Sequence, residues 1–139
     1  MNSRLALAVA AALALQGCVK TYVAPKGVKT ARVNVSASGD LRLCTQNTQY
    51  ALSRSPDNYV EVPSGERITL TRSFYSQGYN VSHSCTAGIS FIPAAGQSYY
   101  ADFDLRSERC ILLVFRELPE SRVGVGLEHS LGKRDYCAN

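Results

Sequence analysis

The chain lacks several features on which common protein functions depend. Beyond residue 15 it has no long apolar run, so we expect no transmembrane helix after the N-terminus. Apart from Cys18, its nearest cysteines are Cys85 and Cys110, and no pair has the C-x-x-C spacing typical of zinc sites. No loop shows the alternating Asp/Asn spacing of a calcium site. We therefore expect the protein to bind no metal and no cofactor.

A strong charge of either sign is also missing. The formal net charge is +4, and loss of Arg4 with an N-terminal signal would lower it by one. The basic residues are scattered rather than clustered. Nucleic acid is therefore not expected as a partner, because its binding needs a basic patch or stripe.

Histidine is scarce, which limits acid–base chemistry. A group of His83, Ser84 and Asp102 can be imagined, but adjacent residues on a strand point to opposite faces of the sheet. A nucleophile and its base must lie within hydrogen-bond reach. We therefore expect His83 to be covered by sandwich neighbours or a loop rather than to act in catalysis.

The carboxylates also fail to suggest an enzyme. Asp102 and Asp104 share one strand face, and a flat sheet face offers no cleft for glycoside hydrolysis. Glu128 and His129 are expected to form a solvated pair near the C-terminus without a third partner. The sequence therefore predicts a protein that is not an enzyme.

The N-terminus carries the most specific pattern in the chain. A positive start precedes an apolar run over residues 5–15, which is typical of a secretory signal and too short to span a membrane. The next residues complete the sequence Leu15-Gln16-Gly17-Cys18, which resembles a bacterial lipobox. The resemblance implies a bacterial lipoprotein with a signal peptide over residues 1–17 and a lipid on Cys18. An ordinary cleaved signal followed by a chance cysteine is the alternative.

Residues 18–29 are expected to be a tether that leads to a domain over residues 30–139. They contain a proline and a glycine and show no regular period. Fully extended, residues 19–29 reach about 35 Å, at roughly 3.3 Å per residue. Lys20, Lys26 and Lys29 can touch anionic head groups, although several acyl chains on one cysteine already suffice for anchoring.

Four cysteines remain in the expected domain, and an even number in a small exported domain predicts two disulfides. Four cysteines allow three connectivities, between which sequence alone does not choose. We favour Cys85–Cys110, which would join neighbouring strands, and Cys44–Cys137, which would fasten the C-terminal tail to the first half of the domain.

Alternation of apolar and polar residues with period two dominates the rest of the chain, and no helical period holds for more than two turns. This pattern predicts an all-β fold, an antiparallel β-sandwich of about seven short strands. Its segments cover residues 30–37, 41–44, 59–62, 67–74, 81–91, 99–104, 110–115 and 123–127.

Three local expectations accompany this pattern. Gln77 and Gly78 should break the strand that precedes them. Gly88 is a plausible β-bulge. Residues 110–115 are apolar at both phases, so they should form a central strand covered on both sides.

Two turn-and-strand segments carry a second resemblance, which covers about a third of the expected domain. They are Val62-Pro63-Ser64-Gly65-Glu66-Arg67-Ile68-Thr69-Leu70 and the later pattern Phe91-x-Pro93-x-x-Gly96-x-x-Tyr99. Together they resemble small envelope lipoproteins with PEGA-like or transthyretin-like sandwiches. The resemblance implies a fold and no activity.

Tyrosine and arginine are abundant, with eight and eleven copies, against one methionine and no tryptophan. Both residue types are enriched at binding hot spots, and loops carry function more often than framework does. The candidate binding residues are Tyr75, Tyr79 and Arg72 around a loop at residues 73–80, with Tyr59 and Arg54 around a loop at residues 53–58. The alternative is that these tyrosines are ordinary strand residues.

These observations predict a lipid-anchored cell-envelope protein that acts as a binding or scaffold module. Its partner would be an envelope protein or cell-wall glycan, in addition to the membrane that holds its lipid. In Gram-negative lipoproteins, an aspartate directly after the lipidated cysteine tends to retain the protein at the inner membrane. Here Val19 follows Cys18, so the resemblance implies the periplasmic face of the outer membrane. The alternative function is an inhibitor or immunity-type lipoprotein that inserts the loop at residues 73–80 into a cell-wall-degrading enzyme.

Overall fold

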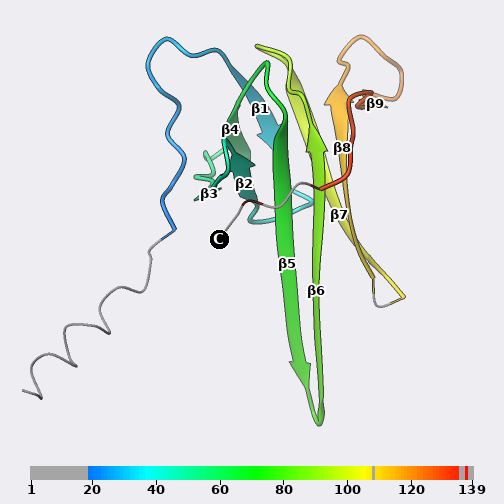
Figure 1. Cartoon of the computed structure of the whole chain (residues 1–139). Coiled ribbons are helices and arrows are strands. Elements are labelled where there is room, and N and C mark those ends of the chain that lie inside the picture. The colour runs from blue at the N-terminus through cyan, green and yellow to red at the C-terminus, as the bar shows by residue number, and fades with distance from the viewer. Residues whose placement is uncertain (1–18, 108, 135–136, 138–139) are drawn as a thin grey trace, which may run out of the picture.

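The computed structural model describes residues 19–107, 109–134 and 137, and in these ranges the chain forms strands and no helix (Figure 1). Cys18 and the expected signal peptide lie outside the described residues. No helix of the described part is long and apolar enough to cross a membrane. The strands are β1 (Thr30–Asn34), β2 (Arg42–Thr45), β3 (Thr48–Ala51), β4 (Tyr59–Pro63), β5 (Ile68–Gly78), β6 (Val81–Phe91), β7 (Ser98–Arg106), β8 (Arg109–Glu117) and β9 (Val125–Leu127).

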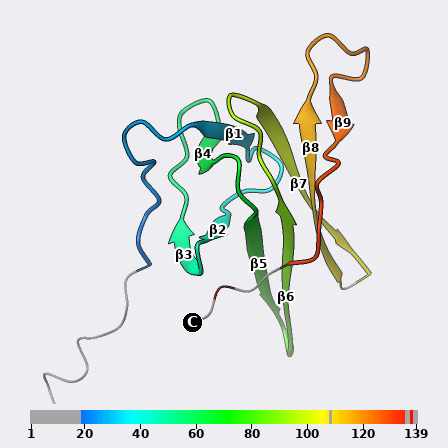
Figure 2. The same cartoon turned by 45° about the horizontal axis from the view of Figure 1, so that its top comes forward.

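The strands form two sheets, so the predicted all-β sandwich is confirmed (Figure 2). One sheet has the order β4-β1-β7-β8-β9 and the other the order β3-β2-β5-β6. Neighbouring strands are antiparallel except β1 and β7, which run parallel. Strand β3 was not anticipated, because its sequence Thr-Gln-Tyr-Ala shows no alternation of apolar and polar residues.

Apolar side chains from both sheets meet in one core, as the period-two pattern predicts. The rings of Phe91 in β6 and Tyr99 in β7 pack edge to face across the two sheets, with centroids 5.1 Å apart. The buried apolar residues are Ala31, Val33, Val35, Leu41, Leu43, Val60, Val62, Ile68, Leu70, Ala87, Phe91, Tyr99, Ala101, Leu112 and Val114.

Both predicted disulfides are present. Cys44 pairs with Cys137, with 5.7 Å between the Cα atoms, and fastens the C-terminal tail to β2 as expected. Cys85 pairs with Cys110, with 5.9 Å between the Cα atoms. These two cysteines lie on β6 and β8, which belong to different sheets, so the expected link between neighbouring strands is wrong. The bridge ties one sheet to the other.

The three local expectations are also wrong, each for a physical reason. Strand β5 continues through Gln77 and Gly78, because its ladder with β6 is uninterrupted to the turn. The same ladder passes Gly88 without a bulge; a Cβ there would lie 2.2 Å from the Arg134 Cδ atom, so the glycine admits the C-terminal tail. In β8, Leu112 and Val114 are buried but Ile111 is exposed, because among the described residues the core lies against the face that carries Leu112 and Val114.

Candidate functional site

The candidate site is the outer half of the hairpin formed by β5 and β6. These strands of eleven residues each pair in one continuous register from Ile68↔Phe91 to Gly78↔Val81. Tyr79 and Asn80 form the turn between them, and Asn80 has a positive φ of 63°, a conformation that asparagine adopts more readily than most residues. The expected loop at residues 73–80 is therefore mostly strand, and only two residues connect the strands.

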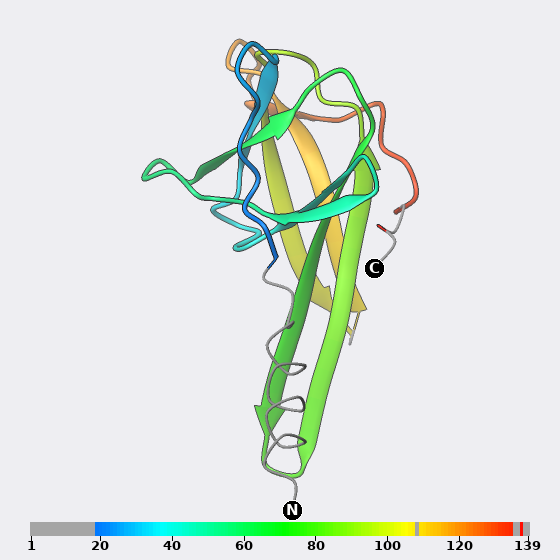
Figure 3. The ribbon, with the colours of Figure 1, turned by 60° about the vertical axis from the view of Figure 1, so that its left-hand side comes forward.

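The outer half of this hairpin extends beyond the sandwich (Figure 3). Strand β2 pairs with β5 only at residues 69–71, and within the described chain no strand pairs with the other sides of residues 73–78 or 81–86. We call residues 73–86 the finger. It is a two-stranded ribbon whose structure depends on its own ladder and on the disulfide at Cys85.

The finger is free of formal charge. Residues 73–101 contain no Asp, Glu, Lys or Arg, in a chain of which 19% is charged. Its outward face carries hydroxyl and amide groups, including a 2.9 Å hydrogen bond between Ser73 Oγ and Thr86 Oγ1. Two tyrosines are open to solvent near the tip: Tyr75 is 64% exposed and Tyr79 is 95% exposed.

The inward face of the finger borders a wide pocket of about 730 Å³. Phe74 and Cys85, which pair across the ladder, line this pocket together with Leu105 from β7. His83 also lines this pocket and is exposed, so the expectation that His83 is covered is wrong. The sandwich neighbours that would cover it end short of the finger.

Arg72 does not join the tyrosines. Alternate residues of a strand point to opposite faces, so Arg72 projects toward the opposite sheet and Tyr75 projects away from it. The Arg72 guanidinium carbon lies 4.7 Å from the centre of the Phe103 ring. A Cβ at Gly39 would lie 1.9 Å from Arg72 Nη1, so the glycine makes room for the arginine. The arginine thus supports the sandwich.

Tyr59 and Arg54 are likewise engaged in contacts within the domain. The Tyr59 hydroxyl donates to the Glu117 carboxylate at 2.9 Å, and the Arg32 guanidinium carbon lies 4.2 Å from the Tyr59 ring centre. Burial and the Glu117 contact raise the pKa of Tyr59. Arg54 forms an ion pair with Asp40 at 2.9 Å. Tyr59 also lines an open groove of about 600 Å³ with Arg32, so this region is a second, weaker candidate.

The imagined catalytic group is not assembled. His83 lies on the inward face of β6 and Ser84 on the outward face of the same strand. Asp102 lies on β7 in phase with Tyr100 and out of phase with the buried Tyr99 and Ala101. It therefore points away from the interior, with the sheet between it and His83.

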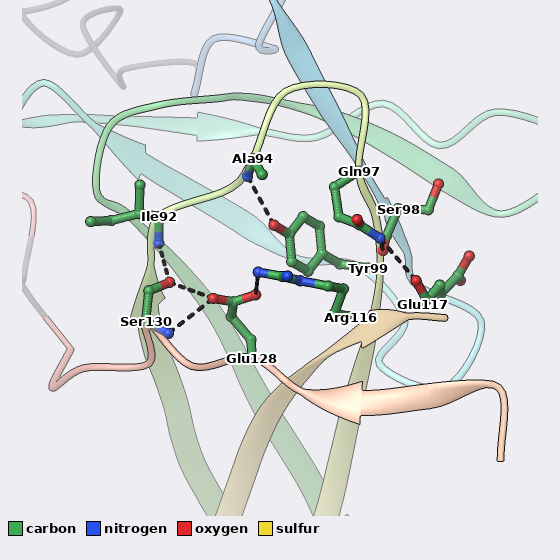
Figure 4. Close-up of polar contacts among 9 residues, drawn as sticks. All are labelled: Ile92, Ala94, Gln97, Ser98, Tyr99, Arg116, Glu117, Glu128 and Ser130. Carbon is green, nitrogen blue, oxygen red and sulfur yellow. Dashed lines mark hydrogen bonds and ion pairs between the residues drawn. The ribbon is translucent and has the colours of Figure 1, made fainter. Parts of the chain in front are cut away.

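A buried carboxylate near the C-terminus was missed by sequence reasoning. Glu128 is only 3% exposed, so the expectation of a solvated pair with His129 is wrong. It accepts hydrogen bonds from Ser130 N (2.9 Å) and Ser130 Oγ (2.8 Å) and forms an ion pair with Arg116 at 3.2 Å (Figure 4). Burial acts to raise the pKa of Glu128, but the Ser130 hydrogen bonds and Arg116 outweigh it and hold the pKa below its usual value.

This network secures the inner end of the hairpin. Ser130 Oγ accepts a hydrogen bond from the backbone N–H of Ile92 at 2.9 Å, directly after β6. Ser90 in β6 exchanges backbone hydrogen bonds with Gly132. No sequence motif predicts this network, because the residues that form it come from distant parts of the chain. In the described ranges, no group of three or more His, Cys, Asp or Glu side chains is placed to hold a metal ion.

Comparisons of the chain with protein-family models, curated proteins and solved structures find no match. The resemblances to bacterial lipoproteins and to PEGA-like or transthyretin-like sandwiches therefore stay predictions.

Proposed function

We propose that this protein is a lipid-anchored, non-enzymatic binding module of the bacterial cell envelope, and that the finger contacts its partner. The observation that carries the proposal is the exposure of Tyr75 and Tyr79 on a charge-free ribbon that extends beyond the domain. Tyrosine offers a large apolar ring, a hydroxyl and few rotatable bonds, which makes it a frequent contact residue at interfaces.

The chemistry of the finger indicates what kind of partner it suits. Hydroxyl and amide groups without formal charge favour an uncharged, hydrogen-bonding surface, whether of an envelope protein or of a cell-wall glycan. A strongly charged partner surface would lose its hydration against this ribbon without gaining an ion pair. The partner is therefore expected to present mostly neutral polar groups.

The location in the envelope is proposed from the lipobox-like sequence before Cys18, with the outer membrane favoured by Val19. Two disulfides suit an oxidising compartment, which supports export. Substitution Cys18→Ala should leave the protein unlipidated and soluble. Unchanged partition with membranes in that variant would contradict the lipid anchor.

An inhibitor of a cell-wall-degrading enzyme is the second candidate. The feature that favours it is the narrow tip, in which only Tyr79 and Asn80 connect the strands. A tip of this shape fits into an active-site cleft more easily than the broad face of a sheet does.

Crosslinking in cells, followed by mass spectrometry of captured material, tests the proposal. Tyr75→Ala with Tyr79→Ala should abolish specific capture, whereas Val123→Ala, at a site 80% exposed in the loop between β8 and β9, should preserve it. A single lytic enzyme among the captured proteins would favour the inhibitor, and envelope subunits or glycan fragments the binding module. Equal capture by both variants would exclude the finger as the contact surface.

A further inference from the structure

The segment expected to be a free tether is instead fastened to the domain. Thr21 pairs with Ala51 at the edge of β3 in parallel orientation. Ala51 N donates to Lys20 O at 2.9 Å, and Tyr22 N donates to Ala51 O at 2.8 Å. Residues 20–22 thus extend the four-stranded sheet beyond β3 (Figure 2). We call residues 19–29 the strap.

Side-chain contacts hold the strap at both ends. The Tyr22 ring packs edge to face on Tyr50, with centroids 5.7 Å apart, and contacts the core. Burial, followed by the nearby Glu66 carboxylate, raises the pKa of Tyr22. At the other end Lys29 O accepts a hydrogen bond from Ser64 Oγ at 2.8 Å. The strap is therefore part of the folded domain.

The exposed side chains of the strap are both apolar and basic. Val19, Val23 and Val28 are 42%, 78% and 48% exposed, respectively. Three lysines, Lys20, Lys26 and Lys29, are exposed between them, and no acidic residue occurs in residues 19–39. Basic side chains interleaved with exposed apolar ones are typical of segments that lie on an anionic membrane surface.

A lipid on Cys18 would bring the strap close to the bilayer. Only Val19 separates Cys18 from Lys20, whose carbonyl is already hydrogen-bonded to β3. Two residues of chain span at most about 7 Å, far less than the 35 Å or so of a free tether. The parallel pairing of Thr21 with Ala51 directs the chain before residue 20 toward the start of β3 at Thr48. A lipid on Cys18 would therefore hold the β2–β3 turn at the head groups.

We propose that the strap and the β2–β3 turn form a docking surface for an anionic bilayer, which holds the anchored domain flat against the membrane. This inference rests on the lipidation of Cys18 proposed above. Two carboxylates of the domain, Glu61 and Glu66, lie close enough to Tyr22 to act on it electrostatically. They offset part of the positive charge of the strap lysines. The exposed lysines and valines remain available to the lipid.

The chain contains no tryptophan, so the fluorescence of a single introduced tryptophan reports on its own position relative to the bilayer. In the chain that begins at Cys18, Cys18 is the one cysteine outside the two disulfides. Its thiol is coupled to a maleimide lipid. The vesicles that carry this lipid consist of brominated phosphatidylcholine and phosphatidylglycerol. One variant carries Thr48→Trp at an exposed site at the start of β3, directly after the β2–β3 turn. The matched control carries Val123→Trp at an exposed site in the loop between β8 and β9, and this loop lies across the molecule from β3 (Figure 1).

Bromine quenches tryptophan only at close range, so Trp fluorescence should be largely lost in Thr48→Trp and retained in Val123→Trp. Equal, weak quenching of both variants would overturn the proposal, because a domain on a free tether samples all orientations. Chemical coupling makes this result independent of natural lipidation and of the finger. Intact mass of the cellular protein tests lipidation separately.

A linker variant tests the chemistry of the strap itself. With a ten-residue Gly-Ser insertion before Val19, quenching in Thr48→Trp should persist on anionic vesicles and disappear on neutral ones. Replacing Lys20, Lys26 and Lys29 by Gln should then weaken the docked state about fivefold per lysine, the ratio that corresponds to about 1 kcal/mol each. Loss of quenching on both kinds of vesicle would overturn the assignment of the strap to a lipid surface.

Discussion

The two halves of the β5–β6 hairpin share one ladder and one alternation of side chains but have opposite surroundings. In the inner half, Ile68, Leu70 and Phe91 are at most 1% exposed. In the outer half, Phe74 is only half-buried, and Val81 is 52% exposed. The difference is the opposite sheet, which covers the inner half and ends near the Cys85–Cys110 bridge.

The two halves of the hairpin are also held in place by different contacts. The inner half is secured by the core, by β2 and by the contacts of Ser130 and Gly132 with the end of β6. Among the described residues, the outer half is held by contacts between its own two strands and by one disulfide. Isolated two-stranded ribbons are marginal in water, so the inner half is what allows the finger to keep its shape.

The largest expected effect separates the two halves directly. Leu70→Ala removes a fully buried side chain and should lower the free energy of unfolding by about 2–5 kcal/mol. Phe74→Ala, on the same face of the same strand, should cost clearly less, because Phe74 is partly solvated already. Chemical denaturation of both variants measures the difference, and equal losses would contradict the division into two halves.

The next effect concerns the boundary between the halves. Replacing Cys85 and Cys110 by Ser opens a bridge with a sequence separation of 25. On the chain-entropy relation this should lower the free energy of unfolding by about 3.5 kcal/mol. Amide hydrogen exchange should quicken in the finger and stay slow near Phe91. Uniform quickening along the hairpin would show that the bridge supports both halves equally.

Acid should weaken the contacts of Glu128 at the inner end of the hairpin. The pKa of Glu128 is lower folded than unfolded, so the unfolded chain binds more protons at low pH. The stability from this group is present above the unfolded value of about 4.3 and is lost as the pH falls through the folded pKa. Glu128→Gln should lower the free energy of unfolding by about 1.5–3 kcal/mol at neutral pH. It should also reduce the loss of stability between neutral and acidic pH. An unchanged acid slope would contradict the buried network.

The smallest expected effect is at the tip. Tyr75→Ala with Tyr79→Ala removes two solvent-exposed rings, so the free energy of unfolding should change by less than about 0.5 kcal/mol. Thermal unfolding followed by circular dichroism checks this. A large drop in melting temperature would mean that the rings support the fold, in which case they are not a free contact surface.

Sequence reasoning was most accurate where the determinants are local or few. The strand pattern, the turns at residues 63–66 and 93–96 and both disulfide pairings agree with the structure. Among the binding candidates, Tyr75 and Tyr79 are exposed together, whereas Arg72, Tyr59 and Arg54 have partners inside the domain. Those partners are brought close only by folding.

By itself the sequence determined the β class and the faces of most strands, because side-chain alternation and residue type are local properties. The pairing of the cysteines was decided by the fold, because four cysteines allow three connectivities. Only the tertiary structure decided which of the side chains on the apolar face of each strand are buried. His83 continues the phase of Ala87 and Phe91 yet is exposed, while Glu128, in a polar segment, is buried. Burial depends on whether another part of the chain lies opposite a residue, and that follows from the packing of distant segments.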